Sequence, residues 1–88
     1  MPDLDADFAE AARAATALPR DPGNDAKLRL YALYKQATSG DVQGRRPGFT
    51  DPVGRAKHDA WARLAGTGAD DAKRAYVELV GDLIGGDD

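Results

Sequence analysis

Apolar residues recur at intervals of three and four along most of this chain, which is the period of an amphipathic helix. The first stripe consists of Leu4, Phe8, Ala11, Ala15 and Leu18. Asp3 is a suitable N-cap for this helix, and the prolines and glycine within 19–23 end it. A second stripe consists of Leu30, Leu33, Tyr34 and Ala37. We expect the second helix to start at Asn24, a good capping residue, and to run to about Ser39, where Gly40 closes it.

The stretch 40–51 contains three glycines, one proline and no helical period, so we expect a long connection. Asp51 and Pro52 then provide an N-cap and a first helical residue for a third helix. This helix should run to about 64–65, before Gly66 stops it.

A fourth helix opens at 68–71, where two aspartates lie near the positive end of the helix dipole, and it continues until 85–86. Its apolar stripe consists of Ala72, Tyr76, Leu79, Val80 and Leu83. Short links join the first helix to the second and the third to the fourth, so we expect those neighbours to be antiparallel. The long connection can cross the bundle, which permits the second and third helices to run in the same direction and to leave an open bowl.

Size and composition limit what these helices can form. The 88 residues suffice for one domain with one modest core, at about 4–84, followed by an acidic tail at 85–88. Cysteine is absent, which excludes disulfides and thiolate metal ligands and fits a reducing compartment. The acidic start lacks the features of a signal peptide, and no apolar run approaches the ~18–20 residues of a membrane span. We therefore expect a cytoplasmic monomer without stable membrane insertion.

Charge and residue inventory argue against several function classes. The net charge of −3 disfavours nucleic-acid binding, which needs a broad basic surface. Ser39 and His58 are the only serine and histidine, and they fall in different predicted helices, so a Ser-His-Asp triad has no basis. A metal site would have to rest on carboxylates and one imidazole without recognisable spacing. We expect no catalysis, no metal and no cofactor.

Against this acidic background, two segments each place a lysine beside aromatic residues on a predicted helix. Tyr31 and Tyr34 share one side of the second helix, and Lys35 lies one turn after Tyr31. The third helix carries Lys57 and, one turn later, Trp61. Hydroxyls, ring faces and fixed cations suit a ligand with a flat base and a phosphate. From spacing alone, solvated lysines and tyrosines at the edge of the bundle remain an alternative.

Other residues have structural interpretations. We expect Trp61 to lie in the core with Phe8 and Leu64 as neighbours, and we assign it no ligand contact. We interpret His58 as a half-buried filler of the third helix, with a pH-sensitive role as the alternative. Arg46 is expected to help order the long connection.

In their order and spacing, these residues resemble the acyl-CoA-binding protein family over roughly Phe8 to Leu83. The matching pieces are Leu30-Tyr31, Tyr34-Lys35-Gln36-Ala37-Thr38, Gly40-Asp41, Arg46-Pro47-Gly48, Gly54, Ala56-Lys57, Asp59-Ala60-Trp61, Leu64, Gly66-Thr67 and Ala75-Tyr76. The resemblance implies an all-α fold, a four-helix up-down-down-up bundle with a long crossover between helices 2 and 3.

The resemblance also implies a ligand site. The positions that match the family's ligand-binding residues are Ala12, Tyr31, Tyr34, Lys35, Lys57 and Tyr76. Tyr31 and the two lysines would gather around the ribose 3′-phosphate of coenzyme A. Tyr34 would pack against the adenine, Tyr76 would help close the site, and Ala12 lies on the helix that lines it. The acyl chain would occupy the apolar bowl.

Three positions depart from the family's pattern. His58 stands where a second tryptophan is usual, Thr16 where many members carry a lysine near the ligand phosphates, and Val53 where a lysine is common. Arg13 and Arg20 are the candidates to replace the charge missing at the first helix. We expect the same ligand class, bound more weakly.

The implied function is a carrier and pool former for medium- to long-chain acyl-CoA thioesters, without catalysis. Acyl-CoA is then the ligand rather than a cofactor, and acyl-CoA-using enzymes are candidate partners. The alternative is a helical protein-interaction module on the same scaffold, with weak or lost ligand binding. An accessory piece of a fatty-acid-oxidation system is a third interpretation. The sequence does not set the preferred acyl length.

Overall fold

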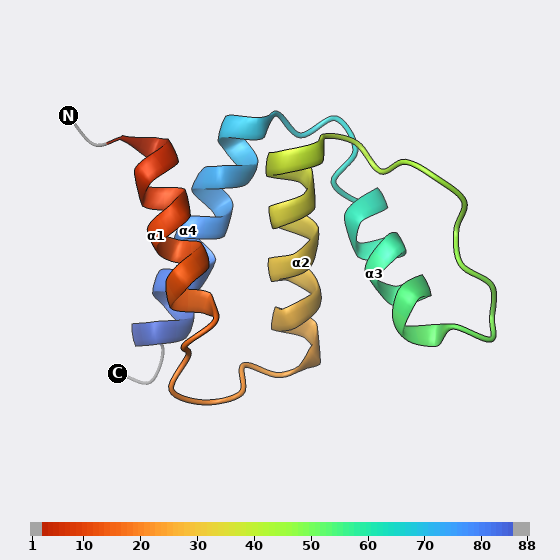
Figure 1. Cartoon of the computed structure of the whole chain (residues 1–88), viewed down its shortest axis with the longest axis horizontal. Helices are drawn as coiled ribbons and strands as arrows, with labels where there is room; N and C mark the ends of the chain where they lie inside the picture. Colours follow the sequence, from red (N-terminus) through yellow and green to blue (C-terminus); the bar gives the residue numbers. More distant parts are fainter. Residues whose placement is uncertain (1–2, 86–88) are drawn as a thin grey trace.

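The computed structural model describes residues 3–85, which form four helices and no strand. The helices are α1 (Leu4–Ala15), α2 (Asn24–Ser39), α3 (Pro52–Ala62) and α4 (Ala69–Gly85). Helices α1 and α4 run in one direction, and α2 and α3 run in the other (Figure 1). The crossover between α2 and α3 passes around the outer side of α3 before that helix begins (Figure 1). The predicted fold class is confirmed, whereas the expected acidic tail falls, beyond Gly85, outside the described residues.

Two helix starts follow the predicted capping chemistry. The Asp3 carboxylate accepts a hydrogen bond from the backbone N–H of Asp5 at 3.0 Å, which caps α1. The Asp51 carboxylate accepts one from the backbone N–H of Gly54, also at 3.0 Å, and Pro52 is the first residue of α3. Both predicted caps are therefore confirmed, because each needs only a carboxylate at the right local position.

Two helices end earlier than their apolar stripes predicted. Helix α1 ends at Ala15, where the hydroxyl of Thr16 turns back and donates to a carbonyl of the last turn at 2.7 Å. Helix α3 ends at Ala62, and the chain continues as turns to Gly66, whose φ of 88° favours glycine. Leu64 lies beyond the end of α3 and still packs against the core. The apolar periodicity therefore continues beyond the last helical residue, since a turn can also direct a side chain toward the core.

The start of α2 differs from the prediction in its cap. Asn24 is the first helical residue, and the N-cap is Gly23, with a φ of 90° and no side-chain cap. The Asp21 carboxylate accepts the backbone N–H of Gly23 at 2.8 Å and the ammonium of Lys27 at 3.0 Å. These bonds, chiefly the one from Gly23, lower the pKa of Asp21. Asp21 thus ties the loop to the first turn of α2, the task predicted for Asn24.

The main core lies where α1, α2 and α4 meet. Its buried residues are Phe8, Ala11, Leu33, Ala37, Ala72, Tyr76, Leu79 and Val80. At the level of the backbone, α2 packs against both α3 and α4, and α1 packs against α4. The predicted opposite directions of α1 and α2, and of α3 and α4, are confirmed, but the helix against which α1 packs its backbone is α4 (Figure 1).

The start of the crossover is fastened to the link between α3 and α4. The buried amide of Gln36 donates to the Asp41 carboxylate and to the Thr67 carbonyl, each at 2.9 Å. The Asp41 carboxylate also accepts the backbone N–H of Gly66 at 2.8 Å, and this bond is the main reason that the pKa of Asp41 is lowered. The ends of α2 and α3 are thereby held at the same end of the bundle, which fixes the seam between them.

Candidate functional site

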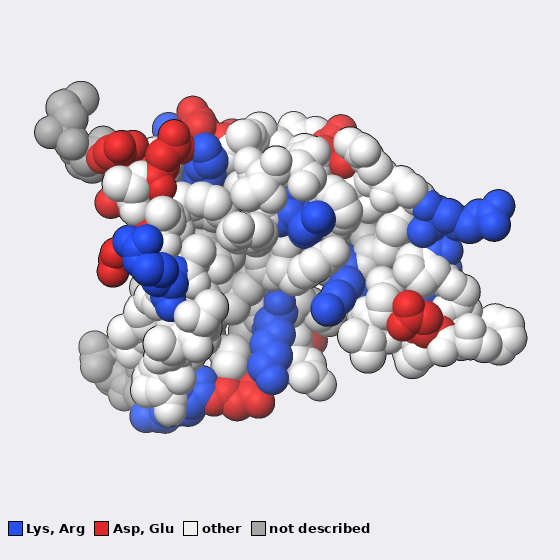
Figure 2. Space-filling model, viewed as in Figure 1, with Lys and Arg blue, Asp and Glu red and all other residues white. Residues whose placement is uncertain are grey.

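The side of α2 that carries the predicted ligand residues is the one turned away from the core. The buried residues of α2 are Ala32, Leu33, Gln36 and Ala37. Tyr31 and Lys35 are half-buried, and Tyr34 is exposed. Figure 2 shows lysine and arginine side chains gathered over α2 and α3 around a hollow, while acidic side chains lie mostly toward the margin. An acidic chain therefore presents a local concentration of positive charge.

Two lysines cross the seam between α2 and α3 in opposite directions. Lys35 of α2 places its Nζ 4.9 Å from the centroid of the Trp61 ring on α3. Lys57 of α3 places its Nζ 5.3 Å from the centroid of the Tyr31 ring on α2. Both distances lie within the ~6 Å over which a cation is attracted to a ring face. The structure thus brings Tyr31, Lys35 and Lys57 to one seam, each ammonium resting on an aromatic ring of the facing helix.

Trp61 lies at this seam rather than beside Phe8. Its side chain is buried, as predicted, but it does not belong to the core cluster that contains Phe8. Its indole N–H donates to the carbonyl of Gly40 at 2.8 Å. The prediction that Trp61 packs with Phe8 is therefore wrong, because the indole turns toward the end of α2 and the start of the crossover.

Three rings from three helices form a second feature of the site. The Tyr34 ring stacks on Phe8 with centroids 5.5 Å apart and planes at 25°. Tyr76 meets Phe8 edge-on at 5.1 Å and lies 6.0 Å from Tyr34. Tyr34 remains 43% exposed, whereas Tyr76 is 5% exposed. Burial, and secondarily the Tyr34 phenol, raise the pKa of Tyr76. The arrangement leaves Tyr34 as a supported aromatic platform at the surface.

The candidate ligand-site residues on and just after α1 are Ala12, Arg13 and Thr16. Ala12 is partly buried and packs against the core one turn after Phe8. Arg13 is paired with Glu10 on the exposed side of α1, and Thr16 brings no charge. Among the described helices, α1 packs its backbone against α4, whereas the lysine pairs lie on α2 and α3.

A groove at the link between α1 and α2 is lined by two further basic side chains. It has a volume of about 440 Å³, and both Arg20 and Lys27 line it. Lys27 lies one turn before Tyr31 on α2, so the two side chains point to the same side of the helix. The sequence signal for this cation is the four-residue spacing from Lys27 to Tyr31, which places both on one side of a helix.

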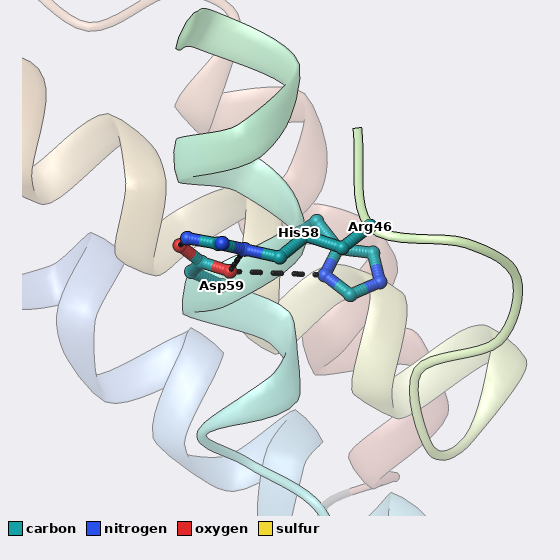
Figure 3. Close-up of polar contacts among 3 residues, drawn as sticks. All are labelled: Arg46, His58 and Asp59. Carbon is teal, nitrogen blue, oxygen red and sulfur yellow. Dashed lines mark hydrogen bonds and ion pairs between the residues drawn. The ribbon is translucent and has the colours of Figure 1, made fainter. Parts of the chain in front are cut away.

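The crossover is fastened to α3 by a two-point ion pair (Figure 3). Arg46 donates through Nε and Nη2 to the two carboxylate oxygens of Asp59, both at 2.8 Å. The pair lowers the pKa of Asp59 and raises the pKa of Arg46. The expected role of Arg46 in ordering the crossover is consistent with this geometry.

His58 lies beside that ion pair. Its Nδ1 is 3.8 Å from the nearer Asp59 oxygen, and its side chain is 18% exposed (Figure 3). Both ring nitrogens are buried and have no hydrogen-bond partner within residues 3–85. The interpretation of His58 as a half-buried filler of α3 agrees with this placement.

Residues 3–85 include no group of three or more histidine, cysteine or acidic residues that could hold a metal ion. Among the helices described, none is both long and apolar enough to cross a membrane.

Comparison with known proteins adds independent information. A family profile described as Acyl CoA binding protein matches residues 5–80. The chain is 47% identical over 77 residues to Acyl-CoA-binding protein homolog 1 of Caenorhabditis elegans, which covers 88% of this chain and 90% of that protein. It is 48% identical over 77 residues to Enoyl-CoA delta isomerase 2 of Rattus norvegicus, covering 88% of this chain. The chain spans only 20% of the length of that isomerase, so the similarity concerns one segment of it.

A solved structure supports the architecture. The crystal structure of Oryza sativa Acyl-CoA-Binding Protein 2 superimposes on this chain with a TM-score of 0.91 at 39% sequence identity. The superposition covers 96% of this chain and 93% of that chain. The four helices and the crossover therefore match an experimentally determined fold over nearly their whole extent.

Proposed function

This chain belongs to the acyl-CoA-binding protein family, and we propose that it binds medium- to long-chain acyl-CoA thioesters and carries them without transforming them. The observation that carries the proposal is the seam between α2 and α3. There, two ammonium groups rest on aromatic rings in the basic part of an otherwise acidic chain. Such a site suits a ligand that presents concentrated negative charge next to a flat base.

The ribose 3′-phosphate of coenzyme A has the required charge. A phosphate monoester carries close to two negative charges at neutral pH. Lys35 and Lys57 reach the seam from different helices, and each ammonium has three N–H donors. The ring beneath each ammonium occupies one side of it, which leaves donors for a phosphate on the other. We assign the hydroxyl of Tyr31, whose ring lies under the Lys57 ammonium, as a further directional donor to the phosphate.

The adenine is assigned to the Tyr34 platform. One face of Tyr34 is stacked on Phe8, so the opposite face remains for a base. Stacking of a base on an aromatic ring contributes about 1–3 kcal/mol. Tyr76 supports this platform from the core, and Ala12 is a small residue on the adjoining helix. We assign these two residues to the walls of the site, where they shape it.

The acyl chain contributes most of the gross affinity. At roughly 0.8 kcal/mol per buried methylene, a sixteen-carbon chain contributes on the order of 10 kcal/mol before the entropic costs of binding. The chain is assigned to the hollow on the same face (Figure 2). Because the charged head orients the ligand and the tail supplies the apolar area, neither part alone should bind well.

The departures from the family's pattern lower the expected affinity but preserve the ligand class. The Thr16 hydroxyl donates its hydrogen bond to a backbone carbonyl, and Val53 is 64% exposed and uncharged. Lys27 offers a cation on the same side of α2 as Tyr31, although the Asp21 carboxylate at 3.0 Å already neutralises part of it.

The cellular role that follows is transport and buffering of acyl-CoA in the cytoplasm by a monomer, with handover to acyl-CoA-using enzymes. The match of this segment to one fifth of an enoyl-CoA isomerase supports an association with acyl-CoA chemistry. The proposal assigns no catalytic group to this chain. The ligand leaves the site as the thioester that entered it.

Removal of both seam cations tests the proposal. The variant Lys35→Ala/Lys57→Ala should lose acyl-CoA binding by at least about a hundredfold, because two charge-assisted contacts disappear, and should keep its helical circular dichroism. Arg29→Ala is the matched control, since Arg29 is exposed on the opposite side of α2 and should change affinity little. Undiminished binding by the double variant would refute the assignment. No measurable binding by the native chain would favour the protein-interaction alternative.

A further inference from the structure

Trp61 is buried at the seam between α2 and α3, and the group over its ring is one of the two seam lysines. The side chain is 9% exposed, lies outside the main core cluster and belongs to α3. Its N–H is committed to the Gly40 carbonyl at 2.8 Å, which leaves its ring face as the part that meets α2. The group on that face is the ammonium of Lys35, 4.9 Å from the ring centroid.

We propose that Trp61 is a positioning residue, which holds the Lys35 ammonium ready for the 3′-phosphate of the ligand. The inference rests on the proposed function, because it names a device that serves the same phosphate contact. Trp61 itself touches no part of the ligand. Its effect reaches the phosphate only through Lys35.

The physical reason lies in the flexibility of lysine. A free lysine side chain has many rotamers, and fixing it during binding opposes affinity through lost conformational entropy. The attraction between the ammonium and the indole face selects a few rotamers before the ligand arrives, and tryptophan is the ring that attracts cations best. Since Lys35 is half-buried, the ring also lies in a partly desolvated place where this attraction is stronger.

The orientation of the Trp61 ring is fixed in turn by its hydrogen bond to Gly40. Gly40 has a φ of 80° and a ψ of −152°, a conformation that glycine adopts more readily than other residues, and its carbonyl accepts the indole N–H. The next residue, Asp41, is tied to Gln36 and to Gly66. The acceptor for Trp61 thus adjoins a part of the crossover that is hydrogen-bonded to the rest of the bundle, and the ring orientation follows from it.

The second pair at the seam is less informative as a test. Lys57 rests on Tyr31, but Tyr31 is also assigned a direct phosphate contact. A substitution of Tyr31 would change both roles together. Trp61 is assigned no direct ligand contact, so a change in phosphate preference on its substitution reports on Lys35 and not on a lost ligand contact.

The experiment compares two ligands that differ only in the 3′-phosphate: palmitoyl-CoA and 3′-dephospho-palmitoyl-CoA. Calorimetry gives the affinity ratio of the two ligands for the native chain, Trp61→Leu and Trp61→Phe. We expect Trp61→Leu to reduce the preference for the 3′-phosphate about three- to tenfold, the size of one partly desolvated cation–ring contact. Trp61→Phe keeps a weaker ring and should lie between. In a Lys35→Gln background, Trp61→Leu should leave the ratio unchanged, because the residue through which it acts is gone.

Leu79→Ala is the matched control for general destabilisation. Leu79 is buried in the main core on α4, so its loss should lower the unfolding temperature and leave the ratio unaltered. An unaltered ratio in Trp61→Phe and Trp61→Leu overturns the inference, and Trp61→Phe decides alone if the leucine variant does not fold. If the native chain binds neither ester, the proposed function is overturned instead. The titrations of the native chain are sufficient to show this.

Discussion

Substitution of the stacked ring of Tyr34 is expected to weaken ligand binding while the protein remains folded. Tyr34→Ala removes the surface of the platform while Phe8 beneath it stays in the core. Loss of one base–ring stack of about 1–3 kcal/mol lowers acyl-CoA affinity about five- to hundredfold. The effect on folding is limited, because the ring is 43% exposed and each of its ring pairs, with Phe8 and with Tyr76, contributes about 0.5–1.5 kcal/mol beyond its area burial. Tyr34→Phe keeps the platform and should bind nearly as the native chain does.

The assay for this prediction is calorimetric titration with palmitoyl-CoA and with palmitoyl-pantetheine, which lacks the nucleotide. Tyr34→Ala should weaken binding of the first ligand and leave the weaker binding of the second almost unchanged. Circular dichroism and urea unfolding establish that the variant is folded. Native-like affinity of folded Tyr34→Ala for palmitoyl-CoA would show that the adenine does not stack on this ring.

Three further predictions concern the scaffold. Phe8→Ala should lower the unfolding free energy by about 3–5 kcal/mol in urea titrations, because it removes the ring on which two tyrosines pack; a loss below about 1 kcal/mol would contradict this. Asp41 has a lowered pKa in the folded state, so its carboxylate stabilises the fold above its ordinary value of 3.8, and this contribution is lost as pH falls through the lowered value. Asp41→Asn should therefore flatten the decline of stability between about pH 5 and pH 2, and an unchanged decline would refute the assignment. Arg46→Gln should speed amide hydrogen exchange within 41–50 and spare the helices, whereas uniform protection would show that the ion pair does not order the crossover.

The parts of the fold that could be predicted are those that depend on neighbouring residues. Helical periods and the carboxylate caps at Asp3 and Asp51 act within one or two turns, so the sequence displays them directly. The packing of α1 on α4 and the hydrogen bond from Gly66 to the Asp41 carboxylate join segments far apart in the chain. No local pattern marks such contacts.

The candidate site likewise contains features that the sequence predicts and features that depend on how the helices pack. The pairing of Tyr31 with Lys35 on one helix and of Lys57 with Trp61 on the next is visible in the sequence, and the family resemblance adds the ligand roles of the two lysines. The crossing of each lysine onto a ring of the facing helix depends on the register between α2 and α3, which no single helix specifies. For this reason the sequence does not reveal that Trp61 lies away from Phe8, and it shows Phe8 only as one position of an apolar stripe and not as the support of the platform.

The most direct test of the account compares three ligands on the native chain: palmitoyl-CoA, free coenzyme A and palmitate. The account requires a charged head and an apolar tail acting together, so the thioester should bind at least about a hundredfold more tightly than either part. Calorimetry measures all three affinities under the same conditions. Equal affinity for palmitate and palmitoyl-CoA would contradict the role of the seam between α2 and α3.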